Sequence, residues 1–454
     1  MVNMTTTPTA AAASTAMLTD HYELTMLRAV LADGTAHHQA VFEAFARRLP
    51  DGRRYGVVAG LGRIVEAIET FTFDTGRVAW LLDRGIIDER TADHLLGYRF
   101  AGNIEGYREG DIYFPNSPVL TVSGTFAECV VLETLILSIL NHDSAIASAA
   151  ARMVSAADGR PLLEMGSRRT NESAAVAAAR AAYIAGFAAT SNLQAGFQYG
   201  VPTRGTAAHA FTLGHTSERE AFASQVASLG TGTTLLVDTY DVPQGIRAAV
   251  EAAGTNLGGI RLDSGDLGDE ARRARALLDS LGATSTTISV TSDLDEHTIA
   301  ALADAPIDLY GAGTKLVGGS GHPTAGMVYK LVAIADEPGP DAPLRPVAKK
   351  ATSKGSVGGR KVAYRALDHQ GHATREVVVV RHLPGAPETG PGRALQVAVI
   401  RDGHVVHRPS LAEIRAHHRG AKSELTALDL DLAPGTPRLV ADPTAIGNLV
   451  GADA

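Results

Sequence analysis

Short apolar runs that end in polar residues recur through the middle of the chain. From residue 160 onward these runs alternate with helical patterns at intervals of roughly 20–45 residues, which is the length of a β/α unit and not of a solenoid repeat. Right-handed crossovers would close such strands into a barrel and bring their carboxyl ends to one face. The predicted strand ends lie near Met165, Ala208, Asp238, Asp263, Thr291 and Tyr310. The predicted helices cover 172–189, 217–229, 243–253, 268–281 and 295–303.

The segments on either side of this alternation have other patterns. Residues 1–16 are small and polar and predict a disordered tail. Residues 17–158 predict an N-terminal α/β domain that ends in a long, largely buried helix. We assign the barrel to 159–337, and a proline-rich break opens 338–454, which we expect to pack on the N-terminal domain. The predicted fold class is α/β: a β/α barrel with an N-terminal α/β domain and a small C-terminal portion.

Composition and charge exclude several classes of protein. The 454 residues are 45% apolar and 20% charged, as in ordinary globular proteins, and the net charge of −8 disfavours a general nucleic-acid binder. No signal-peptide pattern is present, and the apolar runs are shorter than a membrane span. The single cysteine, Cys129, lies in an apolar run and predicts a buried thiol in a reducing compartment. We therefore expect a cytoplasmic protein without nucleic-acid or membrane partners.

A glycine-rich loop, GAGTKLVGG, follows the last predicted barrel strand. Glycines let backbone N–H groups approach phosphate oxygens closely, and a threonine adds a hydroxyl. The spacing matches neither the P-loop nor the Rossmann motif, but the late loops of β/α barrels often bind phosphate. The candidate phosphate-binding residues are Gly311, Gly313, Thr314, Gly318 and Gly319.

The segment IRLDSGDLGD ends another predicted strand. Arg261 and Asp263 are two apart on this strand and so point to the same face. A carboxylate at Asp263 can accept hydrogen bonds from ribose hydroxyls and support positive charge at an anomeric carbon. The acids of this segment can also cap the next helix, through Asp266 or Asp269, and we assign capping to Asp269.

Cationic and hydroxyl side chains end two more predicted strands. Arg168 and Arg169 are adjacent, so one can hold an anion while the other forms a surface ion pair. His209 follows Thr206 in TRGTAAH and can act as an acid, a base or a phosphate acceptor.

Two aspartates in LVDTYDV follow a further predicted strand. Asp238 and Asp241 could order Mg²⁺ or orient His209, or they could cap the next helix. The sequence shows no Cys/His cluster with zinc spacing and no nucleophile-elbow serine.

These motifs, in this order, resemble the nicotinate phosphoribosyltransferase family. The resemblance covers residues 17–365, from LTDHYELTM through LEMGSRRT, GFAATSN, GTAAHAF, LVDTYDV and GAGTKLV to GMVYKL and GGRK. It implies the type II phosphoribosyltransferase fold, with an irregular barrel, and a homodimer whose active sites are completed across the interface. The implied reaction converts nicotinate and phosphoribosyl pyrophosphate to nicotinate mononucleotide and pyrophosphate, in NAD salvage. ATP hydrolysis is coupled to it through a phosphohistidine, with Mg²⁺ as the cofactor.

The resemblance also implies roles for individual residues. His209 corresponds to the phosphorylated histidine, Asp263 to a ribose-hydroxyl partner and Arg168 to an anion-binding arginine. Thr314 and its flanking glycines correspond to the 5′-phosphate site, to which we add Arg169. The residues implied for nicotinate are Tyr22, commonly from the partner subunit, together with Thr206, Arg261, Ser191 and Met165.

The chain departs from the family pattern at two positions. Met165 stands where many relatives have an aromatic ring, and Ala210 where a serine is common. Relatives that use nicotinamide tend to have an aspartate where this chain has Ser191, which favours the acid as substrate. Quinolinate as substrate, a non-catalytic phosphosugar-binding protein and a barrel aldolase stay open as rival interpretations. No lysine ends a strand before position 315, which disfavours the aldolase.

Overall fold

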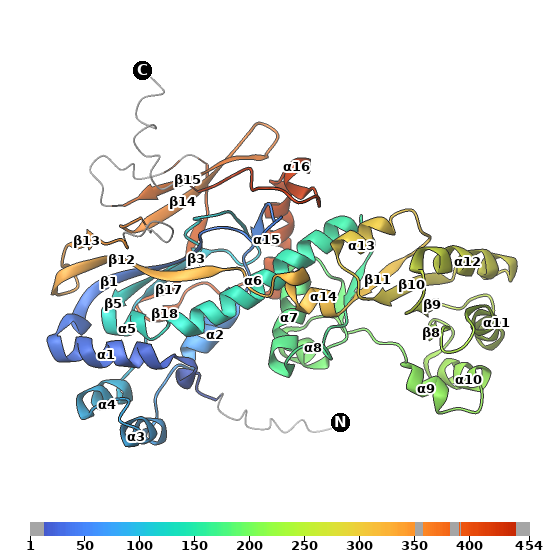
Figure 1. Ribbon diagram of the computed structural model, residues 1–454, viewed down its shortest axis with the longest axis horizontal. Coiled ribbons are helices and arrows are strands. Elements are labelled where there is room, and N and C mark those ends of the chain that lie inside the picture. Colours follow the sequence, from blue (N-terminus) through green and yellow to red (C-terminus); the bar gives the residue numbers. More distant parts are fainter. Residues whose placement is uncertain (1–12, 350–356, 382–389, 391, 442–454) are drawn as a thin grey trace, which may run out of the picture.

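Two large sheets, one antiparallel and one parallel, organise the chain (Figure 1). The computed structural model describes residues 13–349, 357–381, 390 and 392–441. The fold class is α/β, as the alternation of strands and helices predicts. Of the predicted disordered tail, residues 1–12 lie outside the described part. Ser14 and Thr15, by contrast, donate hydrogen bonds to main-chain carbonyls of the N-terminal domain, and the small side chain of Ala16 is buried.

The antiparallel sheet has seven strands and forms the centre of the N-terminal domain. In spatial order they are β13 (Leu344–Pro346), β12 (Met327–Pro338), β1 (His38–Ala46), β5 (Leu120–Thr125), β3 (Asn103–Tyr107), β17 (Gln396–Arg401) and β18 (His404–Val405). The helices of this domain are α1 (His21–Asp33), α2 (Leu61–Glu69), α3 (Thr75–Asp83) and α4 (Glu89–Leu96). A two-stranded sheet pairs β2 (Gly56–Val57) with β4 (Ile112–Tyr113). The range expected for the barrel includes most of β12, yet β12 pairs with β1 in the N-terminal sheet.

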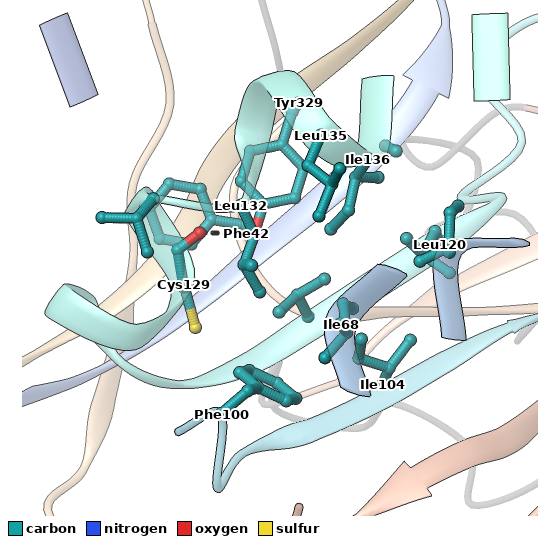
Figure 2. Close-up of a cluster of buried hydrophobic side chains, with 14 of the residues drawn as sticks. Phe42, Ile68, Phe100, Ile104, Leu120, Cys129, Leu132, Leu135, Ile136 and Tyr329 are labelled. Carbon is teal, nitrogen blue, oxygen red and sulfur yellow. Dashed lines mark hydrogen bonds between the residues drawn. The ribbon is translucent and has the colours of Figure 1, made fainter. Parts of the chain in front are cut away.

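The predicted long helix is present in two pieces, α5 (Phe126–Val130) and α6 (Glu133–Ala156). A capping box at Thr125 and Glu128 begins α5. Figure 2 shows the apolar cluster beneath it, in which Cys129 and Leu132 lie near Phe42 and Tyr329. The Cys129 thiol is free and fully buried, as predicted, and burial raises its pKa well above the usual value.

The stretch Phe126–Ala156 is also long and apolar enough to cross a membrane by length and composition alone. Its most apolar window is 67% buried inside the protein, as is usual for the core helix of a folded domain. It is the one candidate span among the described residues.

The parallel sheet has six strands and curves as an incomplete barrel. In spatial order they are β7 (Ala189–Thr190), β6 (Leu162–Glu164), β11 (Leu309–Ala312), β10 (Thr287–Ser292), β9 (Gly259–Leu262) and β8 (Thr234–Leu236). The helices that follow these strands in the sequence are α7 (Glu172–Ala185), α8 (Leu193–Tyr199), α9 (His209–Leu213), α10 (Glu218–Leu229), α11 (Val242–Ala253), α12 (Leu267–Ser280), α13 (Glu296–Ala301) and α14 (Thr314–Val317). Five of these helices match the predicted positions.

The predicted strand end at Ala208 is wrong. The strand in this part of the chain is β7, and 201–208 is an extended loop whose Thr203 forms a single bridge with Thr190. Pro202 lacks an N–H group and Gly205 has no side chain to pack, so the loop cannot continue the ladder. His209 accordingly begins α9 and does not end a strand.

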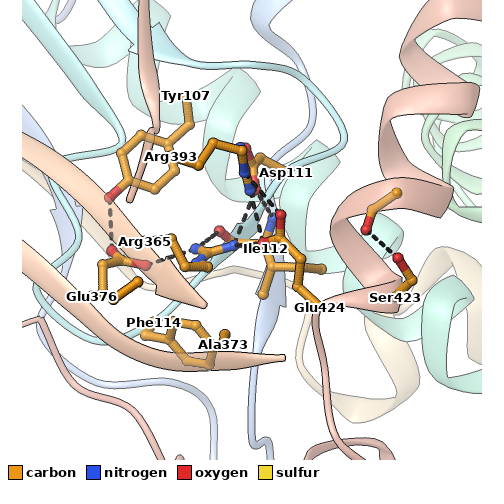
Figure 3. A network of polar contacts seen from close by, with 12 residues as sticks. Tyr107, Asp111, Ile112, Phe114, Arg365, Ala373, Glu376, Arg393, Ser423 and Glu424 are labelled. Carbon is orange, nitrogen blue, oxygen red and sulfur yellow. Dashed lines mark hydrogen bonds and ion pairs between the residues drawn. The ribbon is translucent and has the colours of Figure 1, made fainter. Parts of the chain in front are cut away.

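The C-terminal portion adds a three-stranded sheet and two helices. The sheet contains β15 (Ala373–Val380), β14 (Lys361–Leu367) and β16 (Arg393–Ala394), and the helices are α15 (Leu411–Ser423) and α16 (Ala427–Leu430). Figure 3 shows the buried polar network that joins this portion to the N-terminal domain. Arg365 pairs with Glu376 at 2.7 Å and Asp111 at 3.2 Å, and Glu376 accepts a hydrogen bond from Tyr107 at 2.7 Å.

Candidate active site

One face of the parallel sheet lines a cavity of about 670 Å³. Side chains two residues apart on a strand share a face, and so Leu163 and Met165 line the cavity from β6, as do Ser289 and Thr291 from β10. Arg261 joins them from β9. The cavity therefore collects residues from several distant parts of the sequence, as the barrel prediction requires.

Two arginines, Arg204 and Arg261, line this cavity, and Arg261 comes from the sheet itself. Its Nη1 donates to the hydroxyl of Thr206 and, at 3.2 Å, to the carbonyl of Ala207. Burial lowers its pKa, and its Nε is buried without a hydrogen-bond partner among the described residues. A half-buried guanidinium with unused donors is suited to bind a planar carboxylate. Met165, Thr206 and Arg261, all predicted for nicotinate, lie together here.

A chain of contacts leads from Arg261's strand to His209. Thr291 donates a hydrogen bond to Asp263, and the Asp263 N–H donates to Oδ2 of Asp238 at 2.7 Å. Oδ1 of Asp238 lies 4.0 Å from Nε2 of His209 and has no hydrogen-bond partner in the described part of the chain. Nδ1 of His209 lies 3.1 Å from the Thr239 hydroxyl. The predicted catalytic residues His209 and Asp263 are thus linked through Asp238.

A second buried acid lies beside Asp238. Glu218, at the start of α10, is 9% exposed, and its Oε1 has no hydrogen-bond partner within the described residues. Burial, then the charges of Asp238 and Asp241, raise the pKa of Glu218 to about 7. The carboxylate of Asp241 caps α11 by accepting the Gln244 N–H at 2.9 Å, which confirms capping as its role in the fold. Asp266, and not the predicted Asp269, caps α12.

The glycine-rich loop predicted from the sequence begins inside β11, which contains Gly311. A Cβ on Gly311 would lie 2.5 Å from Thr291 and 2.9 Å from Met165, so only glycine fits beside these two residues of the cavity wall. Thr314 is exposed at the first residue of α14, and Gly313 precedes it. Gly318 follows α14, and Gly319 has the left-handed φ of +62°. The five predicted residues thus belong to one continuous segment that runs from the end of β11 through α14 to Gly319.

The remaining predicted residues near the sheet occupy its rim. Arg168 and Arg169 are exposed in the turn after β6, and Arg168 is close enough to Arg261 to lower that residue's pKa. Ser191 is exposed after β7, and its N–H donates to the Glu164 carbonyl at 2.8 Å. Ser191 is not among the residues that line the cavity.

Tyr22 lies far from all of these residues. It is on α1, which Figure 1 shows at the opposite end of the molecule from α9 and α11. Its side chain is 44% exposed, and burial of the rest, with Glu133 and Glu23 nearby, raises its pKa to about 12. Within one chain, Tyr22 therefore does not reach the cavity.

The acids at the rim offer few ligands for a metal ion. No group of three or more His, Cys, Asp or Glu side chains is placed to hold a metal among the residues described. Mg²⁺ commonly binds one or two carboxylates and completes its shell with water and substrate phosphates. The free Oδ1 of Asp238 suits such a partial site.

Comparison with known proteins identifies the family. A family model described as the nicotinate phosphoribosyltransferase (NAPRTase) N-terminal domain matches residues 17–141. Nicotinate phosphoribosyltransferase pncB1 of Mycobacterium tuberculosis (strain CDC 1551 / Oshkosh) is 56% identical over 433 residues, which cover 93% of this chain and 94% of that protein. The chain belongs to the nicotinate phosphoribosyltransferase family.

Two further members of the nicotinate phosphoribosyltransferase family extend the comparison. The nicotinate phosphoribosyltransferase of Bacillus subtilis (strain 168) is 38% identical over 79% of this chain and 74% of that protein. The crystal structure of human nicotinic acid phosphoribosyltransferase matches with a TM-score of 0.79 at 26% identity, covering 95% of this chain and 99% of that one. The fold is therefore shared over nearly the whole length.

Sequence reasoning on this nicotinate phosphoribosyltransferase family member missed three supporting residues. Glu164 is fully buried and accepts hydrogen bonds from the Gly166 N–H and the Thr190 hydroxyl, which fixes the turn before Arg168. Thr291 donates to Asp263, and Glu218 lies beside Asp238. A charged residue inside an apolar strand, as in LLEM, is the signal that could have revealed Glu164.

Proposed function

We propose that this protein is a nicotinate phosphoribosyltransferase that acts in NAD salvage in the cytoplasm. The pyridine nitrogen of nicotinate attacks C1′ of phosphoribosyl pyrophosphate, the C1′–O bond breaks, and pyrophosphate leaves with the bonding electrons. The products are nicotinate mononucleotide and pyrophosphate. The observation that carries the proposal is the half-buried Arg261 in the cavity, with a buried, free Nε and Thr206 beside it.

Arg261 and Thr206 account for the choice of an acid as substrate. The guanidinium would hold the nicotinate carboxylate, and the Thr206 hydroxyl, which accepts from Arg261, keeps its proton to donate. Met165 offers a thioether to one face of the pyridine ring. The exposed Ser191 adds no negative charge that would favour an amide.

Asp263 and the glycine-rich loop would bind the two ends of the phosphoribosyl group. Asp263 accepts ribose hydroxyls and supports the positive charge that develops at C1′. The loop from Gly311 to Gly319 binds the 5′-phosphate, and Arg168 and Arg169 attract the anion at the rim. Mg²⁺, when bound, would neutralise the leaving pyrophosphate, with Asp238 as its protein ligand.

His209 would couple the reaction to ATP. A phosphoryl group passes from ATP to an imidazole nitrogen, ADP leaves, and water later releases phosphate from the phosphohistidine. Asp238 at 4.0 Å and Thr239 at 3.1 Å support the two ring nitrogens and thereby orient the imidazole. The modified residue can favour a conformation with higher substrate affinity, so that ATP hydrolysis displaces the equilibrium toward product.

The test is mononucleotide formation from phosphoribosyl pyrophosphate with nicotinate, nicotinamide or quinolinate, with and without ATP and Mg²⁺. We expect turnover of nicotinate that ATP accelerates, and His209→Ala should retain basal turnover without acceleration. Turnover of nicotinamide in place of nicotinate would overturn the substrate assignment. No turnover of any pyridine would favour the non-catalytic phosphosugar-binding protein.

A substitution at Arg261 tests whether this residue recognises the carboxylate of nicotinate. Arg261→Gln should lower kcat/KM for nicotinate by about 100-fold, which corresponds to the loss of roughly 3 kcal/mol in charge-assisted hydrogen bonds. The loss for nicotinamide should be smaller, because nicotinamide has no carboxylate to pair with the guanidinium. Equal losses for both pyridines would show that Arg261 does not recognise the carboxylate.

A further inference from the structure

The end of the glycine-rich loop rests on a buried ionic cluster from three separate elements. Arg53 precedes β2, Arg152 is on α6 and Glu296 begins α13, and each is at most 5% exposed. Oε1 of Glu296 lies 3.1 Å from Nη1 of Arg53 and 2.9 Å from Nε of Arg152. Figure 1 shows α6, α13 and α14 close together, where this cluster forms.

The cluster holds the main chain of the loop directly. Nη2 of Arg53 donates to the Gly319 carbonyl at 3.0 Å, and the Ser320 hydroxyl donates to Oε2 of Glu296 at 2.7 Å. Gly319 belongs to the loop proposed for the 5′-phosphate. The loop is therefore fixed at two consecutive residues by side chains that lie outside the cavity.

The backbone at this point needs such support. Gly319, Ser320 and Gly321 have φ values of +62°, +51° and +88°, three left-handed residues in succession. Serine rarely adopts this conformation, because its Cβ crowds the backbone. The hydrogen bond to Glu296 offsets that cost and selects this turn over more extended ones.

The Glu296 carboxylate is ionised in this cluster. Burial alone would raise the pKa of Glu296, but Arg53 and the Ser320 hydroxyl hold it below its usual value. Two guanidinium groups face this carboxylate, and Asp51 and Asp295 line the same small pocket, so the cluster acts on the loop through its hydrogen bonds.

We propose that Glu296 is a positioning residue for the phosphoribosyl 5′-phosphate, acting through Ser320 and Arg53 on the loop at Gly319. The inference rests on the proposed function for the identity of the anion. It assigns Glu296 no contact with substrate. Its loss should weaken binding of phosphoribosyl pyrophosphate and leave nicotinate binding and the chemical step unaffected.

Two variants test this. Glu296→Gln retains the shape of the side chain and removes the charge that holds both arginines. Ser320→Gly tolerates the left-handed φ and removes only the hydroxyl bonded to Glu296. For each variant we expect KM and the calorimetric Kd for phosphoribosyl pyrophosphate to rise about tenfold, as for one lost charge-assisted hydrogen bond. KM for nicotinate and kcat should change less than twofold.

Glu376→Gln is the matched control. Glu376 is also a buried carboxylate that accepts from an arginine and a serine hydroxyl, but it lies in the network of Figure 3 and not at the loop. Its substitution should lower the melting temperature without changing either measure of phosphoribosyl pyrophosphate binding.

The possible outcomes decide for or against the proposal as follows. Unchanged binding of phosphoribosyl pyrophosphate in Ser320→Gly and in a folded Glu296→Gln would overturn it, as would an equal rise in KM for the control. If Glu296→Gln does not fold, Ser320→Gly alone decides. If the unmodified protein binds phosphoribosyl pyrophosphate but converts no pyridine, the proposed reaction fails, while a weaker Kd in the variants still supports the role of Glu296.

Discussion

At the scale of single residues, burial sets the environment of the acids around His209. Asp238 accepts hydrogen bonds from the Asp263 N–H and the Ser264 hydroxyl. Glu218 has no such donors, and its burial, together with the charge of Asp238, raises its pKa to about 7. Glu218 is therefore the acid of this pair whose surroundings oppose the charged form.

This difference predicts a pH-dependent effect of Glu218→Gln on stability. The pKa of Glu218 is about 7 in the folded protein and near 4.5 in the unfolded chain. The contribution of this residue to the free energy of unfolding is therefore complete below pH 4.5 and is lost as the pH rises through 7. The amide resembles the protonated acid and cannot ionise. The variant should gain on the order of 1 kcal/mol at pH 8, after allowance for solvent screening, and less at pH 5. Melting temperatures at both pH values measure this.

Glu220→Gln is the control on the same helix. A hydrogen bond from the Thr216 hydroxyl lowers the pKa of the exposed Glu220. The contribution of Glu220 to the free energy of unfolding therefore has the opposite pH dependence. This variant should show no gain at pH 8. A gain of the same size in both variants would mean that the net charge of the protein, and not the burial of Glu218, is responsible.

Residues at strand ends could be predicted from the sequence, whereas the buried residues that hold the site in place could not. Arg261 lies near the end of an apolar run, so its position at a barrel mouth is implied by the alternation of strands and helices, whereas Thr206 lies in a loop that was predicted as a strand. Glu218 and Glu296 begin helices, where an acid is also common for reasons of helix polarity. Their partners come from distant elements, and one sequence contains no record of those pairings.

At the scale of elements, close contact between helices and strands positions the residues at the rim of the parallel sheet. A Cβ on Gly245 of α11 would lie 2.3 Å from the carbonyl oxygen of Val237, the residue before Asp238. The helix can therefore approach β8 only because this residue has no side chain. The position of Asp238 depends on that approach.

Gly245→Ala should destabilise the protein by about 1–3 kcal/mol, because the new methyl group overlaps the backbone of another element. It should also lower activity, since Asp238 shifts with Val237. Gly420→Ala is the matched substitution in an exposed helix, where a Cβ meets nothing within 4 Å. That variant should be more stable by about 1 kcal/mol, from helix propensity alone. Thermal or denaturant unfolding compares them, and equal effects would refute the packing argument.

The helices were easier to predict than the strands. The five barrel helices that were predicted all begin after a capping residue, for example Asn171, Ser217 and Asp241, and caps are local signals. Several barrel strands have only two to four residues, too few to show a period. For that reason the sequence suggested a strand at Ala208. The pairing of β12 with β1 was missed for another reason, because the two long strands are far apart in the sequence.

At the scale of the whole molecule, the two ends of one chain hold residues predicted for one site. Tyr22 is at the end formed by α1 and α4, and His209 is at the end formed by α9 to α12 (Figure 1). If Tyr22 covers the pyridine ring, it must come from another copy of the chain. This geometry supports the homodimer with shared active sites that the resemblance to the family implies.

Mixing two inactive variants tests the shared site. Tyr22→Ala and Arg261→Ala should each have little nicotinate turnover as homodimers. A mixed dimer has one site with both substitutions and one with neither, so a mixture unfolded and refolded together should recover up to about a quarter of the original activity. Each variant refolded alone is the control. No recovery, with mixed dimers shown to form, would place Tyr22 outside the site.

The pairing of β12 with β1 has a consequence for synthesis on the ribosome. Ala46 pairs with Met327, about 280 residues later, so at 5–20 residues per second one edge of β1 waits roughly 15 to 55 s for its neighbour. β5 covers the other edge of β1 much earlier. During this interval the exposed edge can pair with another nascent chain, so translation speed and chaperone supply should govern the yield of native protein more than its final stability does.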